Sequence, residues 1–236
     1  MASVTREELI KKLQAIKNQG FVKTHRPHDT GIGKTLEDLL GIKENNFRLP
    51  DFGDVELKAK RLESGSMLTL ATKSPHPKSV NKVLFEKYKY PDAHGVYSLH
   101  STVCGSRVNP QGFRIVVEDD KLILHNKQKI EAFWPIATFD DVLRFKVNSV
   151  LLVLADTKGE RKTEKEHFHY KEAFLLSNLD RTKFNLAIKE DWLKVDIRIG
   201  CYRSGIQKGK YHDHGTAFRI NRTDYIHLFR DMEQPI

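Results

Sequence analysis

The sequence contains few cysteines and no long apolar run. Only Cys104 and Cys201 occur, which is too few for a disulfide framework, so a reducing cytoplasm is the expected location. No segment reaches the roughly 18 apolar residues of a membrane span. The segment from Met1 to Gly20 is charged and amphipathic, unlike the apolar centre of a signal peptide. These absences favour a soluble protein without membrane contact.

Internal repeats, low-complexity tracts and flexible linkers are also missing. A chain of 236 residues can bury a substantial core, so one domain over 1–236 is expected. Acidic residues are outnumbered by basic ones, which gives a net charge of +9 and a pI of about 9.4. This balance favours a polyanionic partner, usually nucleic acid. A basic protein with no such partner is the alternative.

The spacing of Pro50-Asp51 and Glu56-Leu57-Lys58 has the form of a PD-(D/E)XK nuclease core. Residues two apart on a strand share a face, so Glu56 and Lys58 point the same way and Leu57 points toward the core. Two carboxylates suit a hard divalent cation, and a nearby amine suits a phosphate or a water molecule. Metal-assisted phosphodiester hydrolysis needs this combination. An ordinary surface strand is the alternative, since E-x-K triplets are common.

A helix expected over 30–41 precedes this motif and carries Lys34 and Glu37. Lys34 lies near the helix N-terminus, where a DNA phosphate could be contacted. Glu37 shares a helical side with Lys34, so we place it beside the catalytic residues, with an ordinary exposed glutamate as the alternative. Further basic residues are expected to contact DNA: Lys60, Arg61, Lys73 and Arg107.

Periodicity and turn residues predict a chain of mixed helices and strands. The predicted helices cover 5–18, 30–41, 80–90, 138–145, 180–190 and 223–231. The predicted strands cover 55–60, 66–72, 97–103, 113–117, 121–125, 149–156, 166–176, 192–200 and 216–220. The strand over 149–156 is almost continuously apolar and should be central, and the strand over 66–72 is expected to form a hairpin with 55–60. The fold class is therefore α/β or α+β.

A second segment, 198–222, carries six basic residues against one acid, Asp213. Glycines let its backbone approach a partner, and arginine, aspartate and histidine can recognise base edges. The candidate DNA-contacting residues are Arg198, Tyr202, Arg203, Lys208, Lys210, His212, Asp213, His214 and Arg219. The sequence His212-Asp213-His214 could instead supply two metal ligands at positions i and i+2, but no third ligand is evident in the sequence. DNA contact is therefore favoured over a metal site or a solvated loop.

Four motifs together resemble a known family. They are TGIGKTLEDLL (30–40), PDFGDVELKAK (50–60), LTLATKSP (68–75) and the pair VDIRIGCYRSG (195–205) and KGKYHDHGTAFRIN (208–221). The sequence resembles restriction endonucleases of the MvaI/BcnI type, most closely the MvaI branch. This family is related to the mismatch-repair nicking enzyme MutH and has the same nuclease core.

The resemblance implies a restriction-endonuclease-like core with a mixed central sheet flanked by helices. A catalytic part, mainly 1–110, and a recognition part, mainly 190–236, would face each other across a cleft. The catalytic residues would be Asp51, Glu56, Lys58 and Glu37, and the ligands of Mg²⁺ would be Asp51, Glu56 and the backbone carbonyl of Leu57.

The resemblance also implies a type II enzyme that acts as a monomer on double-stranded DNA. It would recognise CCWGG, cut one strand at a time, and share its cell with a cognate DNA methyltransferase. Two alternatives stay open. One is a MutH-like strand-nicking repair nuclease, and the other is a sequence-specific DNA-binding protein that has no catalytic activity.

Overall fold

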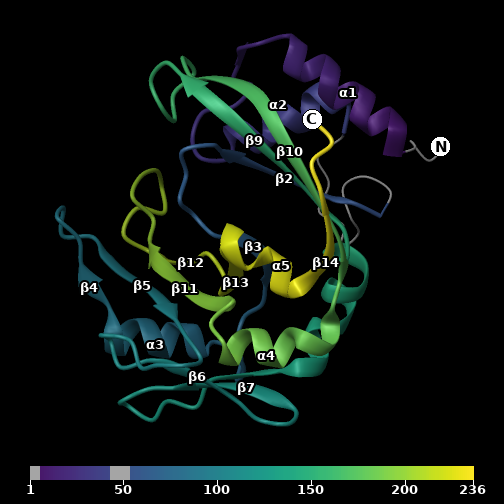
Figure 1. Cartoon of the computed structure of the whole chain (residues 1–236). Helices are drawn as coiled ribbons and strands as arrows, with labels where there is room; N and C mark the ends of the chain where they lie inside the picture. Colours follow the sequence, from purple (N-terminus) through teal and green to yellow (C-terminus); the bar gives the residue numbers. More distant parts are fainter. Residues whose placement is uncertain (1–5, 43–53) are drawn as a thin grey trace. The chain divides into compact units, whose positions relative to one another are not determined.

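The computed structural model describes residues 6–42 and 54–236, and the chain divides into two compact units. Unit 1 comprises Met1–Ser66, Asp141–Asp180 and Phe229–Ile236. Unit 2 comprises Met67–Asp140 and Arg181–Leu228. Each unit has its own sheet, to which segments far apart in the sequence contribute (Figure 1).

The sheet of unit 1 is mixed, as expected for this fold class. Its strands follow the order β1 (Val22–Lys23), β10 (His167–Leu179), β9 (Val150–Lys158) and β2 (Glu56–Arg61), and β14 (Phe229–Glu233) also pairs with β10. Strands β2 and β9 run parallel, whereas β10 is antiparallel to its neighbours. The first six residues of β9 are buried, so the prediction of a central apolar strand is confirmed.

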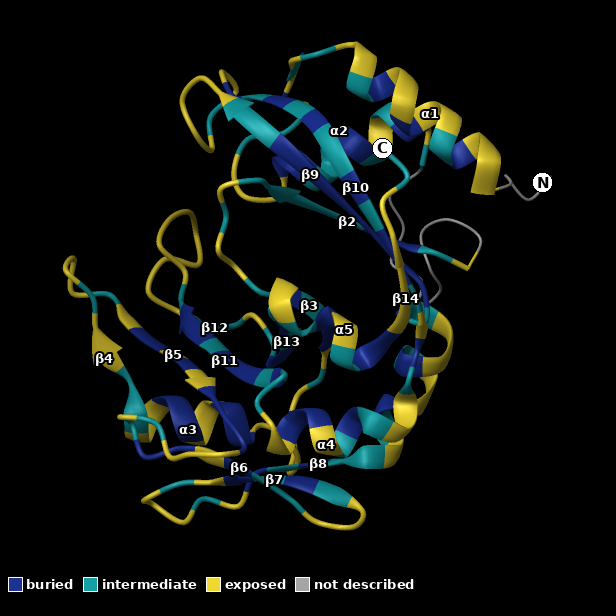
Figure 2. Cartoon of the chain, viewed as in Figure 1, coloured by how far each residue is buried: buried dark blue, intermediate teal, exposed yellow. Residues whose placement is uncertain are grey.

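Helices α1 (Arg6–Asn18) and α2 (Gly31–Leu40) pack together with this sheet. Each contributes a buried apolar stripe (Figure 2), made of Leu9, Leu13 and Ile16 from α1 and Ile32, Leu36 and Leu40 from α2. Gly31 begins α2 at a point where a Cβ atom would lie 2.2 Å from the carbonyl oxygen of Arg26. The start of α2 therefore admits no side chain.

Unit 2 is built on an antiparallel sheet. Its strands follow the order β3 (Leu68–Thr72), β13 (Ala217–Ile220), β11 (Leu193–Cys201), β5 (Tyr97–Val103) and β4 (Tyr90–Pro91), and β12 (Tyr211–Asp213) also pairs with β11. A smaller sheet contains β6 (Arg114–Val117), β7 (Lys121–His125) and β8 (Phe133–Pro135).

Short helices and an aromatic cluster complete unit 2. The helices are α3 (Val80–Tyr88), α4 (Phe184–Lys189) and α5 (Tyr225–Leu228), with 3-10 turns at Ile136–Phe139, Arg181–Lys183 and Arg222–Asp224. Phe218 packs edge-on against Trp134 and Phe139, with ring centroids 5.7 and 4.6 Å away. Trp134 donates its indole N–H to the Lys73 carbonyl at 2.9 Å, so its polar end is satisfied inside the core.

Three sequence predictions are corrected by the structure. The hairpin of 66–72 with 55–60 is wrong, because β3 pairs with β13 while β2 pairs with β9. The helix over 223–231 ends at Leu228, and the chain continues as β14 along β10. The helix over 138–145 is instead a 3-10 turn followed by a π-helical segment, η2 (Val142–Lys146). In the first two cases backbone partners distant in sequence outweigh local preference. The third segment keeps local hydrogen bonds with another spacing, since the Val147 N–H donates to the Val142 carbonyl.

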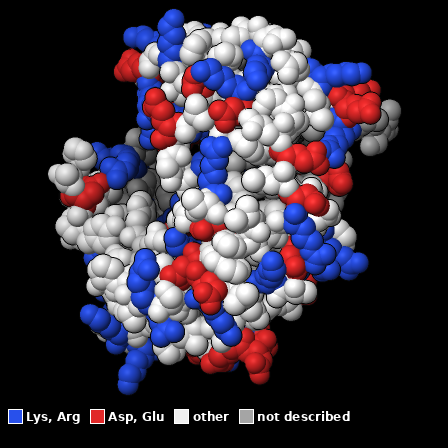
Figure 3. Space-filling model, in the orientation of Figure 1, with Lys and Arg blue, Asp and Glu red and all other residues white. Residues whose placement is uncertain are grey.

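Charged side chains of both signs are interspersed on the face shown in Figure 3, although basic residues outnumber acidic ones in the chain. Within residues 6–42 and 54–236, no helix is both long and apolar enough to cross a membrane.

Candidate active site and nucleic-acid interface

Strand β2 presents Glu56 and Lys58 together in unit 1. The Lys58 ammonium contacts Oε1 of Glu56, whose side chain is only 2% exposed, while that of Lys58 is 32% exposed. Leu57, between them, joins the apolar core of α1, α2 and the sheet. The alternation of strand faces thus places a buried carboxylate and a partly exposed amine on one surface.

The carboxylate of Glu56 has a second cationic neighbour that sequence reasoning missed. Lys146, the last residue of η2, places its Nζ 3.6 Å from Oε1 of Glu56. The two segments meet because Glu56 pairs with Val150 in the parallel register and donates its backbone N–H to the Ser149 carbonyl at 2.9 Å. Nothing in the sequence links Lys146 to Glu56, since the contact depends on this strand pairing.

Of the other predicted catalytic residues, Asp51 lies outside the described residues. Glu37 lies on α2, half-buried, and its charge acts on the phenol of Tyr170, whose pKa is raised chiefly by burial. The residues in the described ranges contain no group of three or more metal-ligating side chains. The described part of the predicted metal site therefore consists of Glu56 and the backbone of Leu57.

Three basic residues predicted to contact DNA have protein partners within unit 1. Arg61 donates two hydrogen bonds of 2.7 Å to the buried carboxylate of Glu166. Lys34 pairs with Asp38 at 2.7 Å, and Lys60 donates to the Ser66 carbonyl. The Arg61 side chain is only 12% exposed, so its local role is to balance Glu166. DNA contact by these residues stays a prediction.

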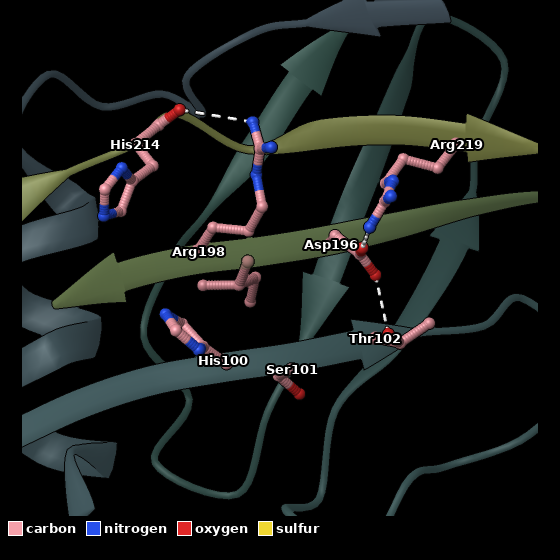
Figure 4. A pocket seen from close by; sticks show the side chains of 8 residues that line it. His100, Ser101, Thr102, Asp196, Arg198, His214 and Arg219 are labelled. Carbon is pink, nitrogen blue, oxygen red and sulfur yellow. Dashed lines mark hydrogen bonds and ion pairs between the residues drawn. The ribbon is translucent and has the colours of Figure 1, made fainter. Parts of the chain in front are cut away.

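In unit 2, a hollow of about 470 Å³ is lined by residues of the neighbouring strands β5, β11 and β13 and by His214. Figure 4 shows its polar lining. On β11, Asp196 and Arg198 lie two residues apart, and they pair across the sheet with Thr102 and His100 of β5. The lining residues are His100, Ser101, Thr102, Asp196, Ile197, Arg198, His214 and Arg219. We refer to this hollow as the β5–β11 pocket.

Asp196 organises one side of the β5–β11 pocket. It is almost fully buried, and it accepts a hydrogen bond of 2.6 Å from the Thr102 hydroxyl and one of 2.5 Å from Arg219. Arg219 also donates to the Met67 carbonyl at 2.9 Å. Two anchors therefore hold the guanidinium of Arg219 in one orientation, and its Nε has no hydrogen-bond partner among the described residues.

Arg198 and His214 form the other side (Figure 4). Arg198 donates to the carbonyls of Gly215 and His214, each at 3.2 Å. Burial, reinforced by the charge of Arg219, lowers the pKa of Arg198. Burial also lowers the pKa of His214, with contributions from His212 and Arg198. His214 is consequently neutral at pH 7, so one of its ring nitrogens can accept a hydrogen bond.

The side chains of His212, Asp213 and His214 do not share one hollow. Asp213 lines a second hollow of about 500 Å³ beside α3, and accepts hydrogen bonds from Asn81 at 2.8 Å and from the Gly215 N–H at 2.7 Å. His214 lines the β5–β11 pocket instead. The His212 ring lies 4.2 Å from the ring of Tyr202 and 4.2 Å from that of His214, so the two histidine rings are neighbours. The carboxylate of Asp213 is thus engaged beside α3, and the described residues supply no third ligand beside the two histidines.

The remaining predicted DNA contacts lie elsewhere in unit 2. Arg203 pairs with Asp92 at 2.7 Å, and Arg107 lies 3.7 Å from Asp191. Lys208 and Lys210 are exposed in the loop between β11 and β12, and the side chain of Lys73 is half-buried. Sequence reasoning missed His100, Ser101, Thr102 and Asp196 as site residues. Only Asp196 had a signal in the sequence: the alternation of apolar and polar residues in the strand predicted over 192–200 places Asp196 and Arg198 on its polar face.

The sequence and the structure were compared with known proteins, and the matches belong to one family. A sequence model of the MvaI/BcnI restriction endonuclease family matches residues 10–229. A solved complex of restriction endonuclease MvaI with cognate DNA is 35% identical, with a TM-score of 0.85 and 98% of each chain covered. Restriction endonuclease MvaI in the absence of DNA is 34% identical, with a TM-score of 0.55 and full coverage of both chains. No curated protein matches.

Proposed function

Because the chain belongs to the MvaI/BcnI restriction endonuclease family, and is thus a site-specific endonuclease, we propose that it cuts double-stranded DNA at CCWGG in a Mg²⁺-dependent reaction. Family membership confirms the resemblance inferred from the four motifs. We further propose that the enzyme acts as a monomer on one strand at a time. A DNA methyltransferase in the same cell would protect the cognate sites.

The observation that carries this proposal is the pairing of Glu56 with Lys58 on β2. A carboxylate that is 2% exposed is costly to bury unless cations balance it, and here two lysines surround it. A divalent cation could also balance the carboxylate of Glu56, because the preferred ligands of such ions are oxygen atoms. Asp51, Glu56 and the carbonyl of Leu57 would hold Mg²⁺. When bound, the metal would polarise the phosphate and favour ionisation of a bound water.

The protein's own residues have distinct roles in this proposal. Lys58 orients or deprotonates the attacking water and helps to neutralise the charge that develops on the phosphate. Glu37, half-buried on α2, positions a water molecule near this group. Neither residue needs a large movement, since the strand and the helix that carry them pack in one core.

The β5–β11 pocket supports recognition of a defined sequence. The solved MvaI relative contains its cognate DNA, and the pocket of this chain offers both donors and acceptors. Arg198 and Arg219 are suited to the acceptor edge of guanine, and Asp213, in the second hollow beside α3, to the amino group of cytosine. Recognition of the outer C·G pairs is assigned to these residues, and contact with the central pair to Tyr202. Lys208 and Lys210 supply attraction to phosphates.

The test is a digest of unmethylated phage DNA with purified protein and Mg²⁺, followed by sequencing of the fragment ends. We expect discrete fragments with ends at CCWGG. Ends at CCSGG or CCNGG would correct the central pair. Nicked but unbroken circles would support a MutH-like repair nuclease, and intact DNA with specific retardation on a gel would support a binding protein without catalysis.

The catalytic assignment has its own test in the Lys58→Ala variant. Cleavage should be abolished while specific binding is retained, because the amine acts on the water and phosphate rather than on the bases. Lys121→Ala is the matched control, since Lys121 also has a carboxylate neighbour, Glu118 at 3.4 Å, but lies in unit 2. Cleavage by Lys58→Ala at near wild-type rate would refute the assignment.

A further inference from the structure

Two lysines share one oxygen of Glu56. The Nζ atom of Lys58 contacts Oε1, and the Nζ atom of Lys146 lies 3.6 Å from the same oxygen. Among the described residues, Glu56 is the one carboxylate within ion-pair distance of Lys146. One carboxylate therefore faces two ammonium groups, and the net charge of these three side chains is positive.

The backbone around Lys146 holds it in this place. The N–H of Val147 donates to the carbonyl of Val142 at 2.9 Å, which closes a π-helical turn with Lys146 as its last residue. Val147 is fully buried, and Ser149, two residues further on, accepts the N–H of Glu56. Such π-turns are rare and frequently occur at functional sites. The turn anchors the Cα of Lys146 while its side chain stays 30% exposed.

A divalent cation would compete with Lys146 for Glu56. Both are attracted to the same carboxylate, and they repel each other. The side chain of lysine is long and flexible, with a strongly hydrated head group, so its ammonium can leave one anion for another while the backbone stays in place. A phosphate of DNA is the anion that the enzyme brings to this site.

We propose that Lys146 is the counter-ion of Glu56 in the metal-free enzyme, and that metal binding releases its ammonium group to the DNA phosphate that is cut. This inference rests on the metal-binding role proposed above for Glu56. Lys146 is then a catalytic residue, because its ammonium group contacts the reacting phosphate. Its ammonium group contacts Glu56 before the metal binds and contributes positive charge at the phosphate afterwards.

The proposal predicts opposite effects of one substitution. Lys146→Met, which keeps the apolar stem, should bind Mn²⁺ about fivefold more tightly without DNA, because a competing cation is removed. Its turnover of DNA should fall at least ~10-fold, with a smaller change in KM. Mn²⁺ binding is measured from the paramagnetic resonance signal of the free ion, and turnover in separate assays with Mg²⁺. A purely structural role would weaken both properties together.

Three variants complete the experiment. Lys146→Arg retains the charge and should resemble the wild type in Mn²⁺ affinity, and Lys121→Met should change neither property. Lys146→Gln repeats the prediction with a polar head group, in case the methionine variant does not fold. Unchanged or weaker Mn²⁺ binding by both neutral variants would overturn the inference.

Failure of the inference is distinguishable from failure of the proposed site. Glu56→Gln should lose both Mn²⁺ binding and cleavage if Glu56 is a metal ligand. If it does so while the neutral Lys146 variants match the wild type, only the role of Lys146 is wrong. If Glu56→Gln binds Mn²⁺ and cuts DNA normally, the metal site itself is wrongly assigned and the inference falls with it.

Discussion

Replacing Glu166 by glutamine should destabilise unit 1 strongly. The Glu166 side chain is 1% exposed and accepts two hydrogen bonds of 2.7 Å from Arg61 and one of 2.9 Å from the Lys162 N–H. Removing one partner of a buried ion pair leaves the other charge uncompensated, at a cost of about 3–5 kcal/mol. Glutamine can still accept one of these bonds, so we expect about 2–3 kcal/mol, or a melting temperature lower by about 5–10 °C.

The same pair gives a dependence on pH. Burial raises the pKa of the Glu166 carboxyl, but the hydrogen bonds from Arg61 and Lys162 outweigh it and hold the pKa below its ordinary value. The folded state therefore binds this proton less readily than the unfolded state. Stabilisation is complete above the ordinary pKa and is lost as the pH falls through the folded-state pKa. The difference between wild type and Glu166→Gln should accordingly shrink below about pH 4.

Melting followed by far-ultraviolet circular dichroism tests this prediction. The control is Glu63→Gln, because Glu63 pairs with Arg161 at 2.9 Å in the same region while both side chains are exposed. Such a surface pair contributes less than about 1 kcal/mol. If the two variants lose the same stability, burial is not the cause and the reasoning is refuted. Arg61→Met tests the pair from its other side, and loss of DNA affinity without loss of stability would assign Arg61 to DNA contact instead.

Further predictions concern unit 2. Arg219→Ala should cost about 1–3 kcal/mol of discrimination at one base pair, whereas an equal loss of affinity for all sequences in a binding assay would make Arg219 a phosphate contact. Gly215→Ala should lower the free energy of unfolding more than Gly209→Ala does, because both have positive φ but only at Gly215 would a Cβ meet Thr72, 2.6 Å away. Because the pKa of His214 is lowered in the folded protein, its protonation reduces stability as the pH falls below about 6.5. The midpoint of urea unfolding should therefore depend less on pH in His214→Asn than in the wild type, when both are measured between pH 7 and 5.

Local patterns predicted the elements well and their pairing less well. Helices α1 and α2 and the apolar strand β9 follow from periodicity, caps and composition. The pairing of β3 could not be inferred, since its buried residues Leu68 and Leu70 suit any sheet with one covered face. Strand β14 was missed because its backbone partners on β10 lie about fifty residues away in the sequence.

The residues of the candidate site were likewise predictable where they are close in sequence, and not where their contact depends on strand pairing. Glu56 and Lys58 were predictable because they are two residues apart on one strand, so their contact needs no tertiary information. Lys146 was not predictable, because its contact depends on the parallel pairing of β2 with β9. Asp196 was visible as a polar residue on a strand face, but alternation alone could not show that this face lines a pocket rather than facing open solvent.

Counting basic residues treats all of them alike, whereas the structure gives them different physical roles. Arg198 and Arg219 are held by backbone carbonyls, and Arg219 also by Asp196. Each has five N–H donors, so donors remain for a base edge, and little side-chain entropy is lost when they bind. Lys208 and Lys210 are exposed, and the phosphate contact that we propose for them would be available on any sequence. Specificity should therefore depend on the two arginines, and the salt dependence of binding on the two lysines.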